Sequence, residues 1–309
     1  MFFQKIKTSE FSQSWFLFLH FLRLHQVVYQ LTLVTIILFF TPNPDLFELF
    51  SAVCMIVLIT PTFLLVQDLL GRKDDEKVNQ KRLVFSERMN KIFFFFSVVI
   101  MGTLLLLNNI ESFICYILLF ISTLSYASAK HFRKMILAYF FRYMSSLFTL
   151  LLYIYILFNG LFSQYYFLIL LVPNLDLVGN IAGDLRDFKK DSKAGVKTLM
   201  TTKGKSFTIQ IMAGILISTL VLLTFYFQSI LVIFLMIFIG IQFFFLKQMP
   251  IRFSHGIFHL GKIVNFLVIT GIIAKVPVIL LILSSTIIIL LWIVSYYFYL
   301  LNSGTSSHA

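Results

Sequence analysis

The chain has 309 residues, of which 59% are hydrophobic and only 12% are charged, and its formal net charge at pH 7 is +12. That much apolar surface cannot be enclosed in a single water-soluble core, so a soluble globular protein is excluded. We therefore expect an integral membrane protein surrounded by a lipid bilayer, with no nucleic-acid partner for its basic residues.

Apolar segments follow one another along the chain and predict one transmembrane domain over residues 1–309. Residues 1–25 contain an amphipathic stretch, around 10–24, and are expected to lie at the membrane interface, ahead of the first span. Most later segments approach the roughly 20 residues that a helix needs to cross a bilayer. The sequence thus predicts nine or ten transmembrane helices, near residues 26–41, 47–67, 91–109, 110–128, 135–158, 161–182, 207–226, 228–246, 257–274 and 277–300.

Lys and Arg residues accompany alternate spans. Groups of them precede the first span and follow the second, fourth, sixth and eighth, and of the 25 in the chain only Lys275 departs from this pattern. Because cytoplasmic loops carry the excess of Lys and Arg, residues 68–90 and 184–206 are predicted to be cytoplasmic polar loops. Four spans separate these two loops, so both are expected to open on the same side.

Several polar residues at the end of the sixth span share one helical face. A helix turns by about 100° per residue, so Asn180, Asp184, Asp187 and Asp191 fall in one stripe, which Asp176 extends into the membrane. Neighbouring carboxylates repel each other unless a cation lies opposite, and oxygen ligands suit a hard ion such as Mg²⁺. A carboxylate at membrane depth is a functional candidate, although a hydrogen bond to a neighbouring helix would also account for Asp176.

A second acidic group follows the second span. Asp68 and Asp75 are two helical turns apart on one face, and Gln67 adds an amide oxygen. Acidic oxygens ringed by cations are typical of a site for a diphosphate carried on Mg²⁺, in which metal ions bridge carboxylates to phosphate oxygens. The candidate cations are Arg72, Lys130, Arg133, Lys134, Arg186 and Lys190.

These motifs resemble those of the UbiA superfamily of intramembrane prenyltransferases. Residues 184–199 contain a DxxDxxxD run followed by Gly195-Val-Lys197-Thr198-Leu199, which is similar to the second aspartate-rich motif of that family. Residues 67–75 take the place of the first motif, NDxxDxxxD, with Gln67 for the usual Asn and Gly71 for the middle Asp. Tyr126 and the basic residues after it resemble a third family segment, and the resemblance covers most of the chain.

The resemblance implies an all-α polytopic bundle of nine transmembrane helices around a central cavity, and hydropathy allows a tenth. It implies transfer of an isoprenyl group from an isoprenyl diphosphate to a small lipophilic acceptor, such as an aromatic or quinone-precursor molecule. Mg²⁺ would be held by Asp68, Asp75, Asp184 and Asp187, with help from Asn180 and Asp191. The active-site loops would face the cytoplasm.

The resemblance also implies roles for single residues. Asp184, Asp187 and Asp191 are the expected catalytic residues, and Asp191 either orients Lys197 or deprotonates the acceptor. Gln67, Asp176 and Lys197 are secondary candidates. The residues expected to bind the diphosphate are Arg72, Tyr126, Lys130, Arg133, Lys134 and Arg186.

Two other functions remain open. Some members of the UbiA superfamily cyclise the prenyl chain without an acceptor, so a membrane terpene cyclase is the alternative enzyme. An ion-coupled transporter also contains intramembrane carboxylates, but it would open its charges to both sides of the membrane. Here only Asp176 is expected to lie deep.

Overall fold

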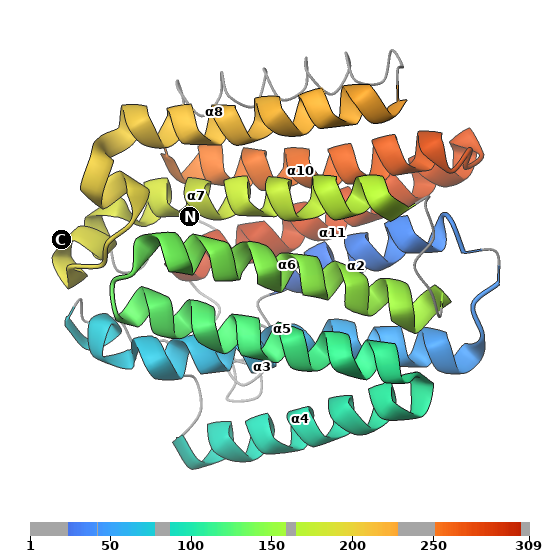
Figure 1. Cartoon of the computed structure of the whole chain (residues 1–309), viewed down its shortest axis with the longest axis horizontal. Helices are drawn as coiled ribbons and strands as arrows, with labels where there is room; N and C mark the ends of the chain where they lie inside the picture. The colour runs from blue at the N-terminus through green and yellow to red at the C-terminus, as the bar shows by residue number, and fades with distance from the viewer. Residues whose placement is uncertain (1–23, 42, 78–86, 159–164, 228–250, 304–309) are drawn as a thin grey trace, which may run out of the picture.

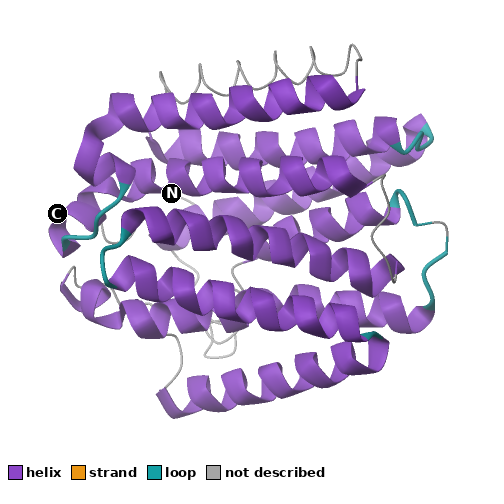
Figure 2. Ribbon diagram, in the orientation of Figure 1, coloured by secondary structure: helices purple, strands orange, loops and turns teal. Residues whose placement is uncertain are grey.

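The computed structural model describes residues 24–41, 43–77, 87–158, 165–227 and 251–303. These parts of the chain fold into nine α-helices and no strand (Figures 1 and 2). The helices are α2 (Leu24–Leu38), α3 (Leu46–Lys77), α4 (Glu87–Asn108), α5 (Ile110–His131), α6 (Met135–Phe158), α7 (Tyr166–Ala194), α8 (Leu199–Phe227), α10 (Ile251–Ile273) and α11 (Val278–Ser303).

Short polar motifs set where these helices begin. The Asp45 side chain accepts a hydrogen bond from the Glu48 N–H (2.7 Å), and the Glu48 side chain accepts one from the Asp45 N–H (2.9 Å), a capping box that starts α3. Asn109 caps α5 by accepting from the N–H of Ser112 (2.6 Å). The Asn109 side chain also donates to the carbonyl of Tyr155 (2.8 Å), which ties the α4–α5 turn to α6.

The helices have the length and polarity of membrane spans. Seven of those described are long and apolar enough to cross a bilayer, and α2 and α10 contain shorter apolar stretches, Gln26–Leu38 and Phe258–Ile273. The described chain is therefore an all-α integral membrane bundle. The predicted span at residues 228–246 lies outside the described residues, so the total of nine or ten stays a prediction.

Helix α7 lies inside the bundle. It packs against α3, α6, α8 and α10, and 67% of its membrane window is buried, against 17–44% for the other candidate spans. Its inward residues, including Leu168, Leu171, Leu175 and Val178, belong to the hydrophobic core. An acidic stripe on such a helix is therefore held among neighbouring helices, away from lipid.

Successive helices alternate in direction, which brings several connections to one end of the bundle. The C-terminal end of α3, the α5–α6 turn and the α7–α8 connection all lie at the left of Figure 1. The described helix ends that border the two polar segments therefore lie at the same end of the bundle. Most of the expected loop at 184–206 is helical, however, since α7 extends to Ala194 and α8 begins at Leu199.

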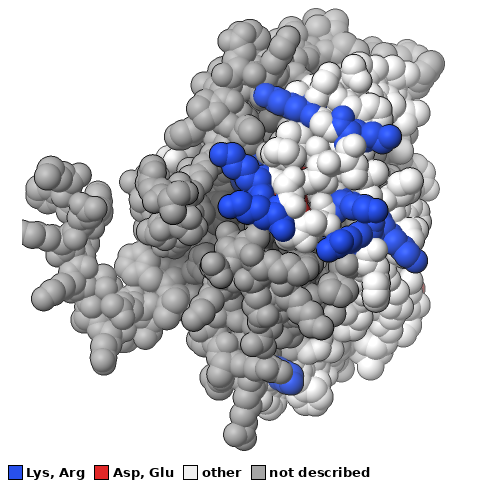
Figure 3. All heavy atoms as spheres, turned by 90° about the vertical axis from the view of Figure 1, so that its left-hand side faces the viewer, with Lys and Arg blue, Asp and Glu red and all other residues white. Residues whose placement is uncertain are grey.

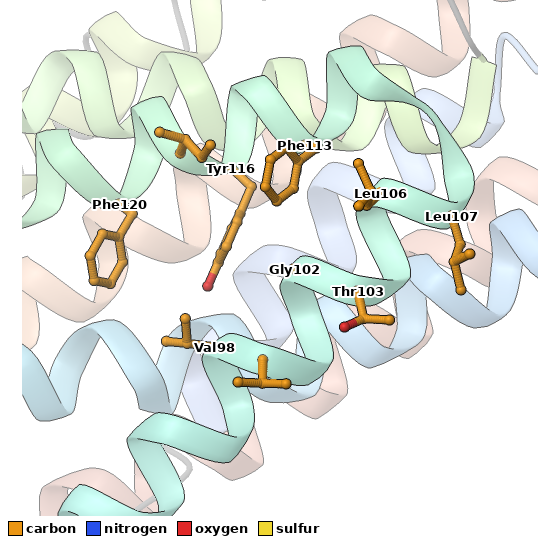
Figure 4. A pocket seen from close by; sticks show the side chains of 10 residues that line it. Val98, Gly102, Thr103, Leu106, Leu107, Phe113, Tyr116 and Phe120 are labelled. Carbon is orange, nitrogen blue, oxygen red and sulfur yellow. The ribbon is translucent and has the colours of Figure 1, made fainter.

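An apolar groove lies on the periphery, between α4 and α5 (Figure 4). It has a volume of about 460 Å³ and is lined by residues such as Val98, Leu106, Phe113 and Phe120, around Gly102. No residue of α7 lines it. The groove is thus separate from the acidic stripe, and the central cavity predicted from the sequence stays a prediction.

Candidate functional site

The C-terminal half of α7 carries the acidic stripe, and a tight turn ends the helix directly after it. Gly195 adopts a left-handed conformation (φ 69°), and the N–H of Val196 donates to the carbonyl of Asp191 (2.9 Å). Glycine accepts this conformation without steric cost. Thr198 and Thr201 then cap α8 through the Thr201 N–H and the Thr198 hydroxyl (3.2 Å), which fixes the start of α8 beside the stripe.

Asp184 is bound by a tyrosine of the neighbouring helix. The Tyr139 hydroxyl on α6 donates to Oδ2 of Asp184 and accepts a hydrogen bond from the backbone N–H of Leu199 (3.0 Å). One phenol thus connects α6, the acidic stripe of α7 and the first turn of α8. Tyr139 was not a sequence candidate, because a single Tyr in a Phe- and Tyr-rich span carries no distinguishing pattern.

Lys130, at the end of α5, lies within electrostatic range of all three carboxylates of the stripe, those of Asp184, Asp187 and Asp191. The carboxylates of Asp187 and Asp191 also act on that of Asp184, and Asp191 is 4% exposed. Tyr126, one turn before Lys130, belongs to the same group. The residues that the sequence grouped from two distant segments therefore come together.

Asp187 and Asn180 already have partners in the structure. Arg186 forms a bidentate ion pair with Asp187, with Nε to Oδ1 at 2.8 Å and Nη2 to Oδ2 at 2.7 Å. The Asn180 amide nitrogen donates to the carbonyl of Asp176 (2.7 Å). That bond orients the side chain of Asn180 and leaves its amide oxygen as the atom suited to a metal ion or a donor.

Arg133 lies at the C-terminal end of α7. Its guanidinium donates to the carbonyl of Ala194 at 3.5 Å, and its atoms come within 3.2 Å of the place where a Cβ on Gly195 would lie. A cation at a helix C-terminus interacts favourably with the helix dipole. Lys134 and Lys197 are exposed.

Figure 3 views this end of the bundle directly. Lys and Arg side chains lie on its surface, whereas Asp and Glu appear only as small traces between them. The exposed cations here include Lys134, Lys189, Lys193 and Lys197. On the described part of this face, an approaching anion therefore meets positive charge first and the recessed carboxylates second.

Asp176 has a different environment from the rest of the stripe. Its Oδ1 lies 2.7 Å from Nζ of Lys262 on α10, and the two side chains are 8% and 2% exposed. The Tyr29 ring of α2 lies 3.9 Å from the same Nζ, and Arg142 of α6 is within electrostatic range. Asp176 thus takes the role of a contact between helices, and the expectation that it alone carries deep charge is wrong.

The pattern of basic residues in the sequence placed Lys262 and Arg142 only in the groups that follow the eighth and fourth spans. Both in fact lie within apolar helices, α10 and α6. A charge inside an apolar span is itself a signal of a buried partner or a site. That signal would have identified both residues.

Part of the predicted site consists of side chains outside the described residues. The backbone of α3 is helical through Lys77, but the side chains of Gln67, Asp68, Arg72 and Asp75 are not described. Among the side chains that are described, no three carboxylate, imidazole or thiol groups are gathered as a metal site. The α7 carboxylates fit a hard cation in chemical type, and a full set of ligands requires those of α3.

Solved structures of a UbiA homolog from Archaeoglobus fulgidus have the same fold. The structure with GPP and Mg²⁺ is 17% identical, covers 90% of this chain and 98% of that one, and has a TM-score of 0.57. Those with DMAPP and Mg²⁺ and with Cd²⁺ are each 16% identical over 90% of this chain and 97% and 98% of theirs, with TM-scores of 0.58 and 0.56. No protein-family model and no curated protein sequence matches the chain. The resemblance stated from the motifs is thereby confirmed at the level of fold.

Proposed function

We propose that the chain is a Mg²⁺-dependent integral membrane prenyltransferase, which moves an isoprenyl group from an isoprenyl diphosphate to a small lipophilic acceptor. One observation carries the proposal. Asp184, Asp187 and Asp191 lie together with Lys130 at one end of a bundle whose solved relatives hold GPP or DMAPP with Mg²⁺.

The donor set suits this role. Mg²⁺ prefers oxygen ligands and usually shares them with substrate phosphates. The stripe offers only carboxylate oxygens and the amide oxygen of Asn180, and Asp68 and Asp75 of α3 would complete it. When bound, Mg²⁺ neutralises the diphosphate and stabilises it as a leaving group.

Other residues of the chain orient the carboxylates and bind the diphosphate. Tyr139 holds the Asp184 carboxylate in one orientation. Lys130, Arg133, Lys134 and Arg72 attract the diphosphate, and Arg186 exchanges its Asp187 partner for a phosphate oxygen, for which a guanidinium is equally suited. Preorganised charges of this kind lower the barrier without reorganising during the reaction.

The proposed reaction is a substitution in which the acceptor replaces the diphosphate on the prenyl carbon. The bond between the prenyl carbon and the diphosphate oxygen breaks, and the electron pair leaves with the diphosphate. The acceptor forms a new bond to that carbon and loses a proton, which Asp191, a buried carboxylate of the stripe, would accept. We place this end of the bundle on the cytoplasmic side because the basic residues gather there.

Other functions have less support. The ion pair with Lys262 neutralises Asp176, the deep carboxylate that an ion-coupled transporter would use. A cyclase must carry a carbocation within the bundle, where the Lys262 side chain is buried and Nε of Arg142 is enclosed. Like charges in a low-dielectric interior repel strongly, which favours capture of the cation by an acceptor near Asp184.

The proposal is tested by turnover in membranes that contain the full chain. Radiolabelled dimethylallyl, geranyl, farnesyl and geranylgeranyl diphosphates are supplied with Mg²⁺ or with EDTA, and with or without added aromatic acceptors. We expect Mg²⁺-dependent label in a lipophilic adduct only when an acceptor is present. A labelled hydrocarbon without acceptor would indicate a cyclase, and turnover in EDTA would contradict the mechanism.

A further inference from the structure

The first turn of α8 is set apart from the rest of the helix. The backbone breaks at Gly204 (φ 82°, ψ 175°), a conformation essentially restricted to glycine, and residues 199–203 turn across the end of the bundle (Figure 1). In an unbroken helix, residues two positions apart, such as Lys203 and Lys205, point about 200° away from each other. The break removes that constraint, and both lysines are exposed.

Two contacts hold this turn beside the start of α6. The Thr202 hydroxyl lies 3.6 Å from Sδ of Met135, and the N–H of Leu199 donates to the Tyr139 hydroxyl (3.0 Å). The first residues of α6 and α8 therefore lie side by side at this end of the bundle. We call the exposed residues here the α6–α8 surface, which consists of Phe132, Ile136, Lys203, Lys205 and Phe207.

The α6–α8 surface combines apolar and basic side chains. Phe132, Ile136 and Phe207 are 70%, 77% and 40% exposed. Apolar side chains exposed on membrane-spanning helices lie against hydrocarbon, whereas the ammonium group of a lysine extends to the headgroup level. The surface therefore lies at the boundary between the hydrocarbon and the headgroups of the bilayer.

The charges of the α6–α8 surface are all positive. Residues 132–140 and 196–210 contain no Asp or Glu, and the Asp191 carboxylate near the end of α7 is buried. A cytoplasmic location accounts for the lysines, but it accounts for neither the break between them nor the apolar side chains exposed beside them. An anionic head with a hydrocarbon tail complements both kinds of side chain, and in a bilayer that description fits an anionic phospholipid.

We propose that the α6–α8 surface binds an anionic phospholipid of the surrounding bilayer. Lys203 and Lys205 contact its headgroup phosphate, and its acyl chains lie against Ile136 and Phe207. The site is separate from the one proposed for the isoprenyl diphosphate, to which neither lysine is assigned. It requires no turnover, so it holds whether or not the proposed function is correct.

The test measures lipid binding to the purified full chain in neutral detergent micelles. The probes are phosphatidylglycerol and phosphatidylcholine with the same tritium-labelled acyl chains, so that they differ only in the headgroup. Because each lysine near a membrane surface favours an anionic lipid by about fivefold, we expect phosphatidylglycerol to bind at least about tenfold more tightly. Equal affinities for the two lipids would overturn the proposal. Inorganic phosphate that displaces the labelled phosphatidylglycerol as effectively as the unlabelled lipid does would overturn the choice of a lipid.

Variants identify the residues responsible. Lys203→Gln combined with Lys205→Gln should abolish the preference for phosphatidylglycerol. Lys189→Gln combined with Lys193→Gln is the matched control, because it removes two exposed lysines from the end of α7, and it should keep the preference. A preference that survives in the first double variant, or that is lost equally in the control, would overturn the assignment to the α6–α8 surface.

An electrostatic contact with the headgroup also predicts a dependence on salt. The Debye length falls from about 10 Å at 0.1 M to about 3 Å at 1 M ionic strength, so the preference should decrease at least about threefold over this range. Binding of both labelled lipids to the wild-type chain is measured at the two ionic strengths. A preference that does not change with salt would overturn the role given to the two lysines.

Discussion

Asp176 of α7 and Lys262 of α10 form an ion pair at 2.7 Å inside the bundle, with both side chains almost fully enclosed. The pair joins two helices whose residues are 86 positions apart in sequence. The Tyr29 ring of α2 covers the ammonium group from another side. The pair thus fixes α7, and with it the acidic stripe, relative to the C-terminal helices.

Removing one member of this pair should destabilise the protein. Asp176→Asn leaves the Lys262 charge buried and uncompensated, which costs about 3–5 kcal/mol in buried ion pairs of this kind. The free energy of unfolding in mixed detergent and SDS micelles measures the loss. The double variant Asp176→Leu with Lys262→Met should recover much of it, and a double variant less stable than Asp176→Asn would contradict this account.

Replacing Tyr139 by Phe should lower turnover more than stability. The substitution removes the hydroxyl that holds Asp184 and that accepts from the Leu199 N–H. Because a hydrogen bond to a charged group is worth about 1.5–3 kcal/mol, loss of the one that orients Asp184 for the reaction should lower turnover at least about fivefold. Tyr143→Phe, on the same helix, is the control for loss of a phenol. Equal activities of the two variants would show that the Tyr139 hydroxyl does not position Asp184.

Gly195→Ala should weaken diphosphate binding through Arg133. A Cβ at this position would lie 3.2 Å from the Arg133 guanidinium and would strain a left-handed residue (φ 69°) by about 1–2 kcal/mol. We expect a higher KM for the diphosphate and a slightly lower Tm. Gly214→Ala, where a Cβ meets no atom within 4 Å, is the matched control and should leave KM unchanged.

Substitutions of Arg186 should show whether its charge or its bidentate geometry binds the diphosphate. The Arg186 guanidinium pairs with both carboxylate oxygens of Asp187. In the proposed function it moves to a phosphate oxygen when the substrate binds. Arg186→Gln should raise the KM for the diphosphate strongly, and Arg186→Lys should do so by a smaller factor. Steady-state kinetics with geranyl diphosphate measures both, and a KM unaffected by Arg186→Gln would exclude the exchange.

The fold and half of the site followed from local patterns in the sequence. Asp184, Asp187 and Asp191 could be placed on one face because helical periodicity depends only on spacing. Lys130 could be grouped with them because alternating spans bring its turn to the same end of the bundle. The fold class followed from hydropathy, since only helices satisfy their backbone hydrogen bonds within a single membrane-crossing segment.

Contacts between distant helices could not be predicted in this way. The pairing of Asp176 with Lys262 and the bridge through Tyr139 depend on how α6, α7 and α10 pack, which spacing along one helix does not determine. The helical state of most of 184–206 was also missed. Its polar residues are typical of a solvated loop, but packing against α6, the bond from Arg133 to the Ala194 carbonyl and the cap at Gly195 extend α7 to Ala194.

Equilibrium binding of radiolabelled geranyl diphosphate to the purified full chain tests the central claim most directly. The account predicts saturable binding in Mg²⁺ that is lost in EDTA and reduced at least about tenfold by Asp184→Asn, because the carboxylate that holds the metal is gone. Asp45→Asn, at the opposite end of the bundle, should bind like the wild type. Equal binding in Mg²⁺ and EDTA, or an Asp184→Asn protein that binds like the wild type, would contradict it.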